Sequence, residues 1–275
     1  MKKRWKIFWI VCGGIAAAGI LLCVMGLAAG AVTQIAGFIH SRGGTEPYID
    51  PEYEPDMENR EDVTAFTGIS SMEIDVTDIG VDVRTYDGEE ILVDIGSLRS
   101  DLRDQVEISQ QNGELEIVLD RDQKIWDTNE NGTIYVSVPG SLRFDEVTGD
   151  LGTGLLEMSG IQTGTLSLDV GVGTAEVNDF TADNLEVNCG VGSVVLNGET
   201  AVRAKICCSV GEVTYTAAGA KEDYDYILSC GLGEVLVDSE VYSDLGEENI
   251  RVDRAGNRVI EAECSIGSIV IRFEE

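Results

Sequence analysis

The sequence predicts an all-β fold, a β-solenoid (β-helix) with coils of about 19–22 residues, preceded by one N-terminal transmembrane α-helix. Two observations predict it. A short glycine-containing phrase recurs six times, with anchor residues at 152, 171, 190, 209, 231 and 265, and residues 7–40 contain no Lys, Arg, Asp or Glu. The intervals between the anchors are 19, 19, 19, 22 and 34 residues. Such a period, with short alternating apolar runs, is typical of stacked strands rather than of a globular enzyme core.

The copy at 166–177 indicates how one coil is built. Its apolar residues alternate up to Val172, which predicts a strand with one apolar face. The next apolar residue, Ala175, follows after three positions rather than two. We therefore expect a bend or bulge at Gly173-Thr174, because a slip of one residue would turn every later side chain to the opposite face.

The same interpretation applies to the copy at 188–196. It places Val191 and Val194 inward, and it places Ser193 and Val195 in solvent beyond a corner at Gly192. Five corners of this kind predict a stack of coils, each of which buries its apolar side against its neighbours.

Two other meanings of the Gly-x-Gly phrase do not fit. A phosphate-binding loop needs a third glycine and a following helix, whereas a second strand follows each copy here. A calcium-binding β-roll needs aspartate at the position that Ala175, Val194 and Val235 occupy.

The N-terminal 62 residues divide into three segments. Residues 1–6 form a basic tail, 7–40 a transmembrane anchor, and 41–62 a tether with three of the chain's four prolines and interleaved acids. The uncharged run exceeds the h-region of a signal peptide, which argues against cleavage at Ala29-Gly30-Ala31. A lipoprotein signal is disfavoured because Leu22 precedes Cys23.

Charge is distributed unevenly along the chain. Residues 1–42 hold five basic and no acidic residues, and the remainder holds 14 basic and 50 acidic residues, a net charge of −36. A body this acidic repels phosphate, so we expect no nucleic-acid partner. The charge either keeps the protein soluble or forms a face that binds cations or polycations.

The strand pattern begins at residue 63 and extends to 275. We expect strands on both sides of Thr77-Asp78 as a looser coil, hairpin turns at Asp87-Gly88 and Asn112-Gly113, and a short helical turn within 96–104. Residues 238–262 suit a hairpin or an irregular coil. The chain ends on residues 269–275, whose charges are expected to protect a terminal edge strand from further pairing.

The cysteines recur at one position of the repeat. They are Cys189, Cys208, Cys230 and Cys264, and the equivalent positions of earlier copies hold Leu151 and Val170. This equivalence indicates buried structural thiols. A ladder of soft-metal ligands is the alternative, but paired spacings such as Cys-x2-Cys are absent. Cys207 is expected to be the exposed thiol of the repeats, and Cys12 and Cys23 lie in the predicted anchor.

No residue is predicted to be catalytic, to bind a cofactor or to bind a metal. The only histidine, His40, lies at the predicted membrane boundary. The repeat domain therefore cannot form a catalytic pair or triad in which a histidine activates a serine or cysteine nucleophile. Acid pairs are too frequent in this chain to indicate a glycosidase. We therefore expect a protein that is not an enzyme and carries no cofactor.

Three segments resemble a known family. They read FTGISSMEIDV at 66–76, GELEIV at 113–118 and IYVSVP at 134–139. Together they resemble the bacterial β-strand-repeat family called "putative adhesin", the domain of unknown function numbered 4097, over about residues 65–275. The resemblance implies a membrane-anchored protein, in some members encoded beside envelope-stress signalling systems. It implies no catalytic residues.

The expected protein is a single-pass membrane protein with a cytoplasmic N-terminus and a strand-repeat domain on the other side. Its expected function is a non-enzymatic cell-envelope module that binds a partner protein or polymer or takes part in envelope-stress signalling. The alternative is a structural, self-assembling or adhesive surface element, which would make it a homo-oligomer.

The topology follows from four cations before residues 7–40 and one after them. We predict that protease added to intact cells or protoplasts digests residues 63–275, while an N-terminal tag stays protected. Protection of the repeat domain together with cleavage of the tag would contradict this orientation.

Overall fold

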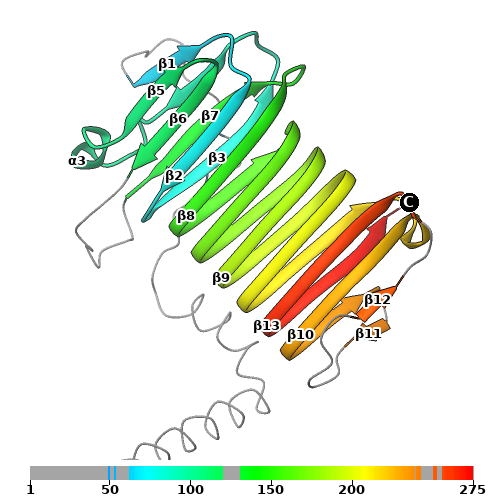
Figure 1. The fold of residues 1–275 in the computed structure, drawn as a ribbon. Helices are drawn as coiled ribbons and strands as arrows, with labels where there is room; N and C mark the ends of the chain where they lie inside the picture. The colour runs from blue at the N-terminus through cyan, green and yellow to red at the C-terminus, as the bar shows by residue number, and fades with distance from the viewer. Residues whose placement is uncertain are drawn as a thin grey trace, which may run out of the picture. The chain divides into compact units, whose positions relative to one another are not determined.

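The computed structural model describes residues 62–119, 131–238, 240–242, 250–252 and 256–274, together with Ile49 and Tyr53. These residues form an all-β fold with one 13-stranded sheet (Figure 1). The strands are β1 (Val63–Phe66), β2 (Ser71–Val76), β3 (Ile79–Tyr86), β4 (Ile91–Asp94), β5 (Glu107–Gln111), β6 (Glu114–Leu119), β7 (Thr133–Pro139), β8 (Arg143–Ser159), β9 (Gln162–Ala218), β10 (Tyr224–Val237), β11 (Glu240–Tyr242), β12 (Ile250–Val252) and β13 (Arg258–Glu274). A short helix, α3 (Ser100–Arg103), and a 3-10 turn, η1 (Lys221–Asp223), interrupt them.

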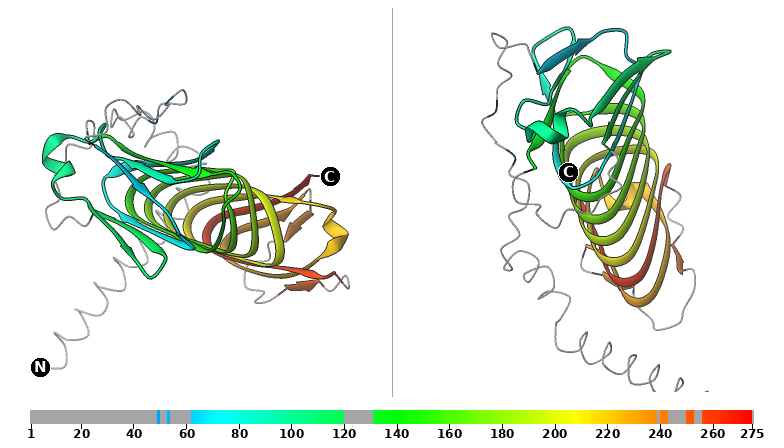
Figure 2. Two further views of the ribbon diagram at one scale, coloured as in Figure 1. Left: turned by 90° about the horizontal axis from the view of Figure 1, so that it is seen from above. Right: turned by 90° about the vertical axis from the view of Figure 1, so that its left-hand side faces the viewer.

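The coils are parallel and stacked in register. Strand β8 pairs with β9 from Arg143 opposite Gln162 to Ser159 opposite Asn178, a constant offset of one 19-residue repeat. Strand β9 then continues for 57 residues without interruption. Figure 2 shows these segments as nested flattened loops. The predicted solenoid of short coils is confirmed.

The core lies between the two sides of each flattened coil. In the copy at 166–177, Leu166, Leu168 and Val170 are fully buried on one side, and Ala175 and Val177 are fully buried on the other. Stacked residues of the neighbouring coils continue both rows, so each coil completes its apolar core only against the next.

The corner of this coil begins before Val191, whereas the sequence predicted that it begins after Val191. Val194 is fully buried and Val195 is 36% exposed, as expected, but Val191 is 43% exposed and its equivalent Val172 is 50% exposed. The inward row already ends at Cys189, and Gly190-Val191-Gly192 forms the corner with its middle side chain outside. The odd spacing between inward residues is real, but simple alternation assigned the corner valine to the wrong face.

The second glycine of each phrase is required by close approach between coils. A Cβ at Gly192 would lie 2.0 Å from the carbonyl oxygen of Gly173, and one at Gly233 would lie 2.2 Å from that of Gly267. This glycine-to-carbonyl contact repeats from coil to coil. It gives the spatial order of the corners, which is Gly154, Gly173, Gly192, Gly211, Gly267 and Gly233. The first glycine is less constrained, because Ser209 and Ser265 occupy that position.

The N-terminal strands form a looser coil, as predicted. β2 pairs with the first half of β8 and β3 with its second half, so they are two sides of one coil around Thr77-Asp78. Asp78 turns this corner with φ 64°, and its N–H donates to the carbonyl of Thr153 at 2.7 Å.

Of the two predicted hairpin turns, one is confirmed and one is wrong. Asn112 and Gly113 have φ 53° and 87°, and they join the antiparallel strands β5 and β6. Residues 87–88 do not make a hairpin, because β4 pairs with β1 and β7 rather than with β3. The place beside β3 is taken by β7, whose parallel pairing continues the stack. The predicted helical turn within 96–104 is α3.

The C-terminal strand is not at the edge, contrary to prediction. β13 inserts between β9 and β10, with Ile266 opposite both Val210 and Leu232. β10 is therefore the last full coil. The antiparallel strands β11 and β12 cover parts of its outer edge. Each pairs with β10, so the described part of 238–262 that precedes β13 forms neither a hairpin of its own nor a further coil.

The predicted tail, the anchor, most of the tether, Cys12, Cys23 and His40 lie outside the described residues. Among the residues that the structure describes, no helix is long and apolar enough to cross a membrane. Two tether residues are not solvated as expected. Ile49 is buried, and Tyr53 stacks on Tyr135 of β7 with ring centroids 3.7 Å apart.

The glycine contacts predict that two Gly→Ser substitutions in one coil differ strongly in their cost to stability. Gly233→Ser places a Cβ 2.2 Å from a backbone carbonyl of the neighbouring coil, and we expect a loss of at least about 2 kcal/mol of unfolding free energy. Gly231→Ser, two residues away, meets its nearest backbone atom at 3.0 Å in a row that already holds Ser209 and Ser265. It should cost within about 1 kcal/mol. Denaturant unfolding of both variants measures the difference, and equal losses would contradict the close-approach explanation.

Candidate functional site

Acidic side chains form rows on the outer face of one side of the coils. In-register parallel pairing places equivalent residues of neighbouring strands side by side. Asp75 of β2 therefore lies opposite Asp150 of β8, which lies opposite Asp169 of β9. In the adjacent row Glu73 lies opposite Glu116 of β6.

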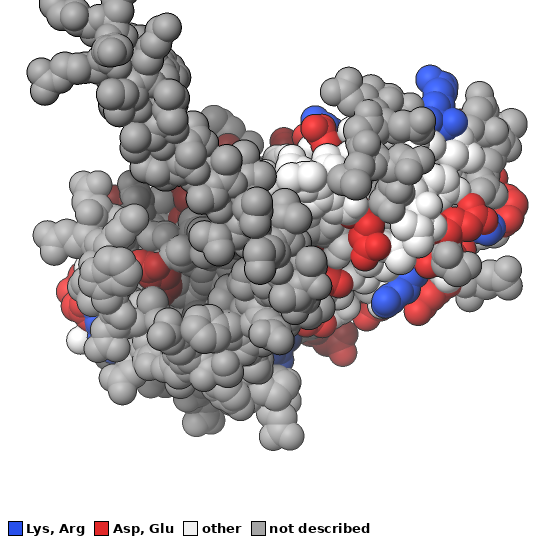
Figure 3. All heavy atoms as spheres, turned by 90° about the horizontal axis from the view of Figure 1, so that it is seen from below, with Lys and Arg blue, Asp and Glu red and all other residues white. Residues whose placement is uncertain are grey.

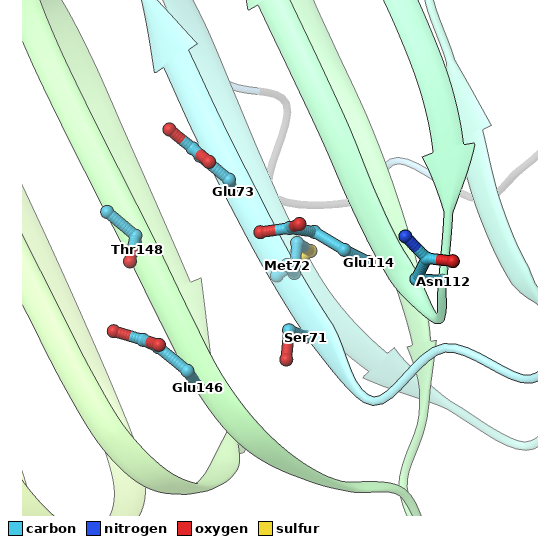
Figure 4. Close-up of a pocket in the computed structure, with 7 residues that line it drawn as sticks. All are labelled: Ser71, Met72, Glu73, Asn112, Glu114, Glu146 and Thr148. Carbon is cyan, nitrogen blue, oxygen red and sulfur yellow. The ribbon is translucent and has the colours of Figure 1, made fainter.

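A polar cleft of about 310 Å³ opens at the N-terminal end of these rows (Figure 4). Glu114 of β6 and Glu146 of β8 lie opposite Ser71 from either side. Figure 4 shows their carboxylates and that of Glu73 on three neighbouring strands. The described residues that line the cleft include no lysine or arginine; they are Ser71, Met72, Glu73, Asn112, Glu114, Glu146 and Thr148.

Burial and the charges of neighbouring carboxylates disfavour the ionisation of Glu73. Burial raises the pKa of Glu73, and the nearby charges of Glu116, Glu114, Asp75 and Asp150 raise it further. Ionised carboxylates here are short of counter-charge, and a cation held among them would stabilise the ionised form.

Burial and neighbouring charges also raise the pKa of an aspartate in the adjacent row. Burial raises the pKa of Asp150, and the charges of Asp75 and Asp169 add to the effect. The electrostatic repulsion therefore extends from the cleft along the row of aspartates rather than stopping at one residue.

A second hollow of about 160 Å³ lies on the other side of the coils, over β3, β8 and β9. Asp82 is only 2% exposed there, and Nε of Arg84 donates to its Oδ1 at 2.9 Å. Burial raises the pKa of Glu157 in this hollow, as do Asp82 and Glu176, while Arg84 lowers it. Because this hollow contains its own cation, it needs a positive ligand less than the cleft does.

The acidic rows are not arranged as a metal site. Within the described ranges, no group of three or more His, Cys, Asp or Glu side chains is placed to hold a metal ion. Carboxylates in one row project side by side from strands about 4.8 Å apart instead of converging on a point. The geometry suits several positive charges spread along the row better than one small ion.

The cysteines occupy a single inward row, as expected for structural thiols. Cys189, Cys208 and Cys264 are buried, Cys230 is half-buried, and all four are free thiols. Cys208 lies opposite Cys264, which lies opposite Cys230.

Hydrogen bonding and burial raise the pKa of two thiols in this row. The hydrogen bond with Cys208, followed by burial, raises the pKa of Cys189. For Cys208 the bond with Cys189 lowers the pKa, but the bond with Cys264 and burial raise it to about 12. Protonated thiols are weak nucleophiles and weak metal ligands. Cys207, expected to be exposed, is half-buried, and burial raises its pKa as well.

The sequence assigned no functional residue, and it missed the cleft. Alternating acids at 73 and 75 and at 114 and 116 gave a signal for outward carboxylates. The pairing of β2 with both β6 and β8 brings these acids together, and it joins segments about 40 and 75 residues apart, which single-strand periodicity does not reveal. The expectation that the protein is not an enzyme stays a prediction.

Stacked parallel coils with an apolar interior and acidic outer rows define a repeat protein of the β-solenoid class. The sequence profile of the Toastrack family, DUF4097, matches residues 69–269, and the chain belongs to this family. The resemblance seen in the sequence is thereby confirmed. No curated protein matches the chain.

Three solved bacterial structures are similar to this chain at low sequence identity. A "putative cell adhesion protein" from Clostridium sporogenes is 15% identical with a TM-score of 0.47, and the match covers 77% of this chain and 98% of that one. A "putative adhesin" from Bacteroides fragilis is 10% identical with a TM-score of 0.35, covering 76% and 94%. One from Parabacteroides distasonis is 16% identical with a TM-score of 0.33, covering 76% and 94%. The family assignment therefore depends on the profile match.

The raised pKa values predict how stability depends on pH. The folded state retains protons on Glu73 and Asp150 that the unfolded chain releases at the ordinary values of 4.5 and 3.8. Their stabilising contribution is fully present below those values and is lost as the pH rises through the folded pKa values. We expect the thermal midpoint to fall as the pH rises above these ordinary values.

A charge-removing variant isolates the effect of the cleft. Glu73→Gln should raise the midpoint at pH 7 and flatten its pH dependence, because the repelled charge is gone. Glu89→Gln, in the exposed loop between β3 and β4, removes the same charge outside the cleft and should change both less. Identical pH profiles for the two variants would show that the repulsion is not concentrated in the cleft.

Proposed function

We propose that the protein is a non-enzymatic binding module of the cell envelope, and that the acidic outer face of its solenoid binds ligands with several positive charges. The observation that carries the proposal is the cleft around Ser71, where carboxylates from three strands lie together. Burial there raises the pKa of Glu73, and the charges of neighbouring acids raise it further. A polycation bound there relieves repulsion already present in the folded protein.

The charge balance supports a cationic ligand. Among the described residues, no ion pair involves a carboxylate of the cleft. The acidic surface also raises the local concentration of cations and speeds their association. Nucleic acids are disfavoured for the same reason, because phosphates meet a surface of like charge.

The shape of the rows selects the kind of cation. Side chains about 4.8 Å apart along the stack match positive groups repeated along a polymer or a peptide. A basic envelope protein or a cationic polymer is therefore the proposed partner. Combined with the predicted anchor at residues 7–40, this supports a module displayed outside the membrane that senses or adheres to cationic partners.

Self-assembly through end-to-end stacking is the less favoured function. At the C-terminal end, β11 and β12 cover parts of the edge of β10 with short antiparallel strands, which leaves no full-length parallel edge there. Net negative charge further opposes the approach of two copies.

The test is binding of fluorescent oligolysine to the full-length chain. We expect micromolar or tighter binding at low salt that weakens steeply as salt is added, because charge interactions are screened. The variant Glu73→Gln/Glu114→Gln/Glu146→Gln should weaken binding about tenfold or more. The matched control, Asp87→Asn/Glu89→Gln/Glu90→Gln, removes equal charge from an exposed loop and should have a smaller effect. No binding, or equal loss in both triple variants, would reject the cleft as the binding site.

A further inference from the structure

An exposed apolar ridge runs along one corner of the solenoid. It consists of the middle residues of five successive corners, in the spatial order Val172, Val191, Val210, Ile266 and Leu232. Val172, Val191, Val210 and Leu232 are 50%, 43%, 44% and 49% exposed, and Ile266 is half-buried. Large apolar side chains exposed in a continuous row are typical of interaction sites.

The ridge stands clear of its surroundings. Every member lies between two small residues, for example Val191 between Gly190 and Gly192, and Val210 between Ser209 and Gly211. With strands about 4.8 Å apart, five members span about 19 Å. This length equals about 13 residues of an α-helix at 1.5 Å per residue.

The fold does not require apolar side chains at these positions. The close approach between coils depends on the glycine that follows each ridge residue, not on the ridge residue itself. In the first regular coil the equivalent position holds Thr153, which pairs opposite Val172. The aliphatic character of the other five positions is therefore a property of the surface rather than of the core.

Acidic side chains border the ridge on both sides. Asp169 and Glu263 lie three residues before Val172 and Ile266, and Glu212 and Glu234 lie two residues after Val210 and Leu232. All four are exposed. Figure 3 shows one face of the molecule, on which uncharged residues of the described coils lie among acidic and a few basic side chains.

We propose that this ridge docks a cationic amphipathic segment of a partner, with the apolar stripe of the segment on the five ridge residues. Its Lys or Arg side chains lie against the flanking carboxylates. The proposal rests on the proposed function and adds a selection rule: the partner must carry an apolar stripe as well as positive charge.

Charge complementarity favours this occupant over two others. A second copy placed ridge to ridge brings the acidic borders of both molecules together, which costs free energy by repulsion of like charges. An anionic lipid surface meets the same repulsion. A cationic amphipathic segment satisfies the apolar row and its acidic borders simultaneously.

The test compares two peptides on the full-length chain in nanodiscs of zwitterionic lipid, with empty discs subtracted. Both peptides have about 18 residues and the same number of lysines; one has leucines at helical i, i+3, i+4 and i+7 spacing, and the other has glutamine at those positions. Wild-type protein should bind the leucine peptide about tenfold more tightly than the glutamine peptide.

Two double variants with the same Val→Ser changes show which surface distinguishes the leucine peptide from the glutamine peptide. Val191→Ser/Val210→Ser lies on the ridge, whereas Val202→Ser/Val241→Ser changes valines that are 53% and 57% exposed elsewhere. The ridge variant should lose the tenfold preference and still bind the glutamine peptide normally, and the control should keep it. Unchanged thermal midpoints verify that both variants are folded, as exposed positions lead us to expect.

Each other outcome overturns the proposal in a distinct way. Equal affinity for both peptides, or equal behaviour of the two variants, rejects the ridge but leaves the acidic module intact. Absence of binding to either peptide rejects the proposed function and the ridge together. A dimer in sedimentation that the ridge variant abolishes identifies a second copy as the occupant instead.

Discussion

The contact between the second glycine of each corner and the backbone carbonyl of the neighbouring coil governs the structure. At 2.0 to 2.3 Å from the place where a Cβ would lie, these carbonyls leave room for no side chain at Gly173, Gly192, Gly211, Gly233 or Gly267. The approach fixes the register of each coil on the next, because a shift of one residue would bring a larger residue into the contact. The in-register rows of the core and of the surface follow from this constraint.

Register turns a sequence repeat into chemically uniform rows. Inside, it stacks cysteines on one another, and hydrogen bonds and burial keep the thiols of Cys189 and Cys208 protonated and unreactive. Outside, it sets Asp75, Asp150 and Asp169 side by side and concentrates charge that a less regular fold would disperse. The same rule that makes the interior stable makes the acidic face electrostatically strained.

The two ends of the stack are built differently from its middle. At the N-terminal end, β6 and β7 continue the parallel stack beside β2 and β3, and β5, β4 and β1 then add to it as antiparallel strands. At the C-terminal end the chain leaves a gap between β9 and β10, and β13 later fills it in parallel with both. The antiparallel strands β11 and β12 then cover part of the edge of β10, so a further parallel strand cannot pair along its full length.

The sequence by itself determined the all-β class, the coil period, the inward row of cysteines and the turn at Asn112-Gly113, because these depend on local periodicity and on residues with special backbone freedom. Tertiary structure alone decided three things: the outward position of Val191, the insertion of β13, and the meeting of Glu73, Glu114 and Glu146. Each depends on which strand lies beside which. That choice is made by packing between segments distant in the chain, and alternation within one strand carries no information about it.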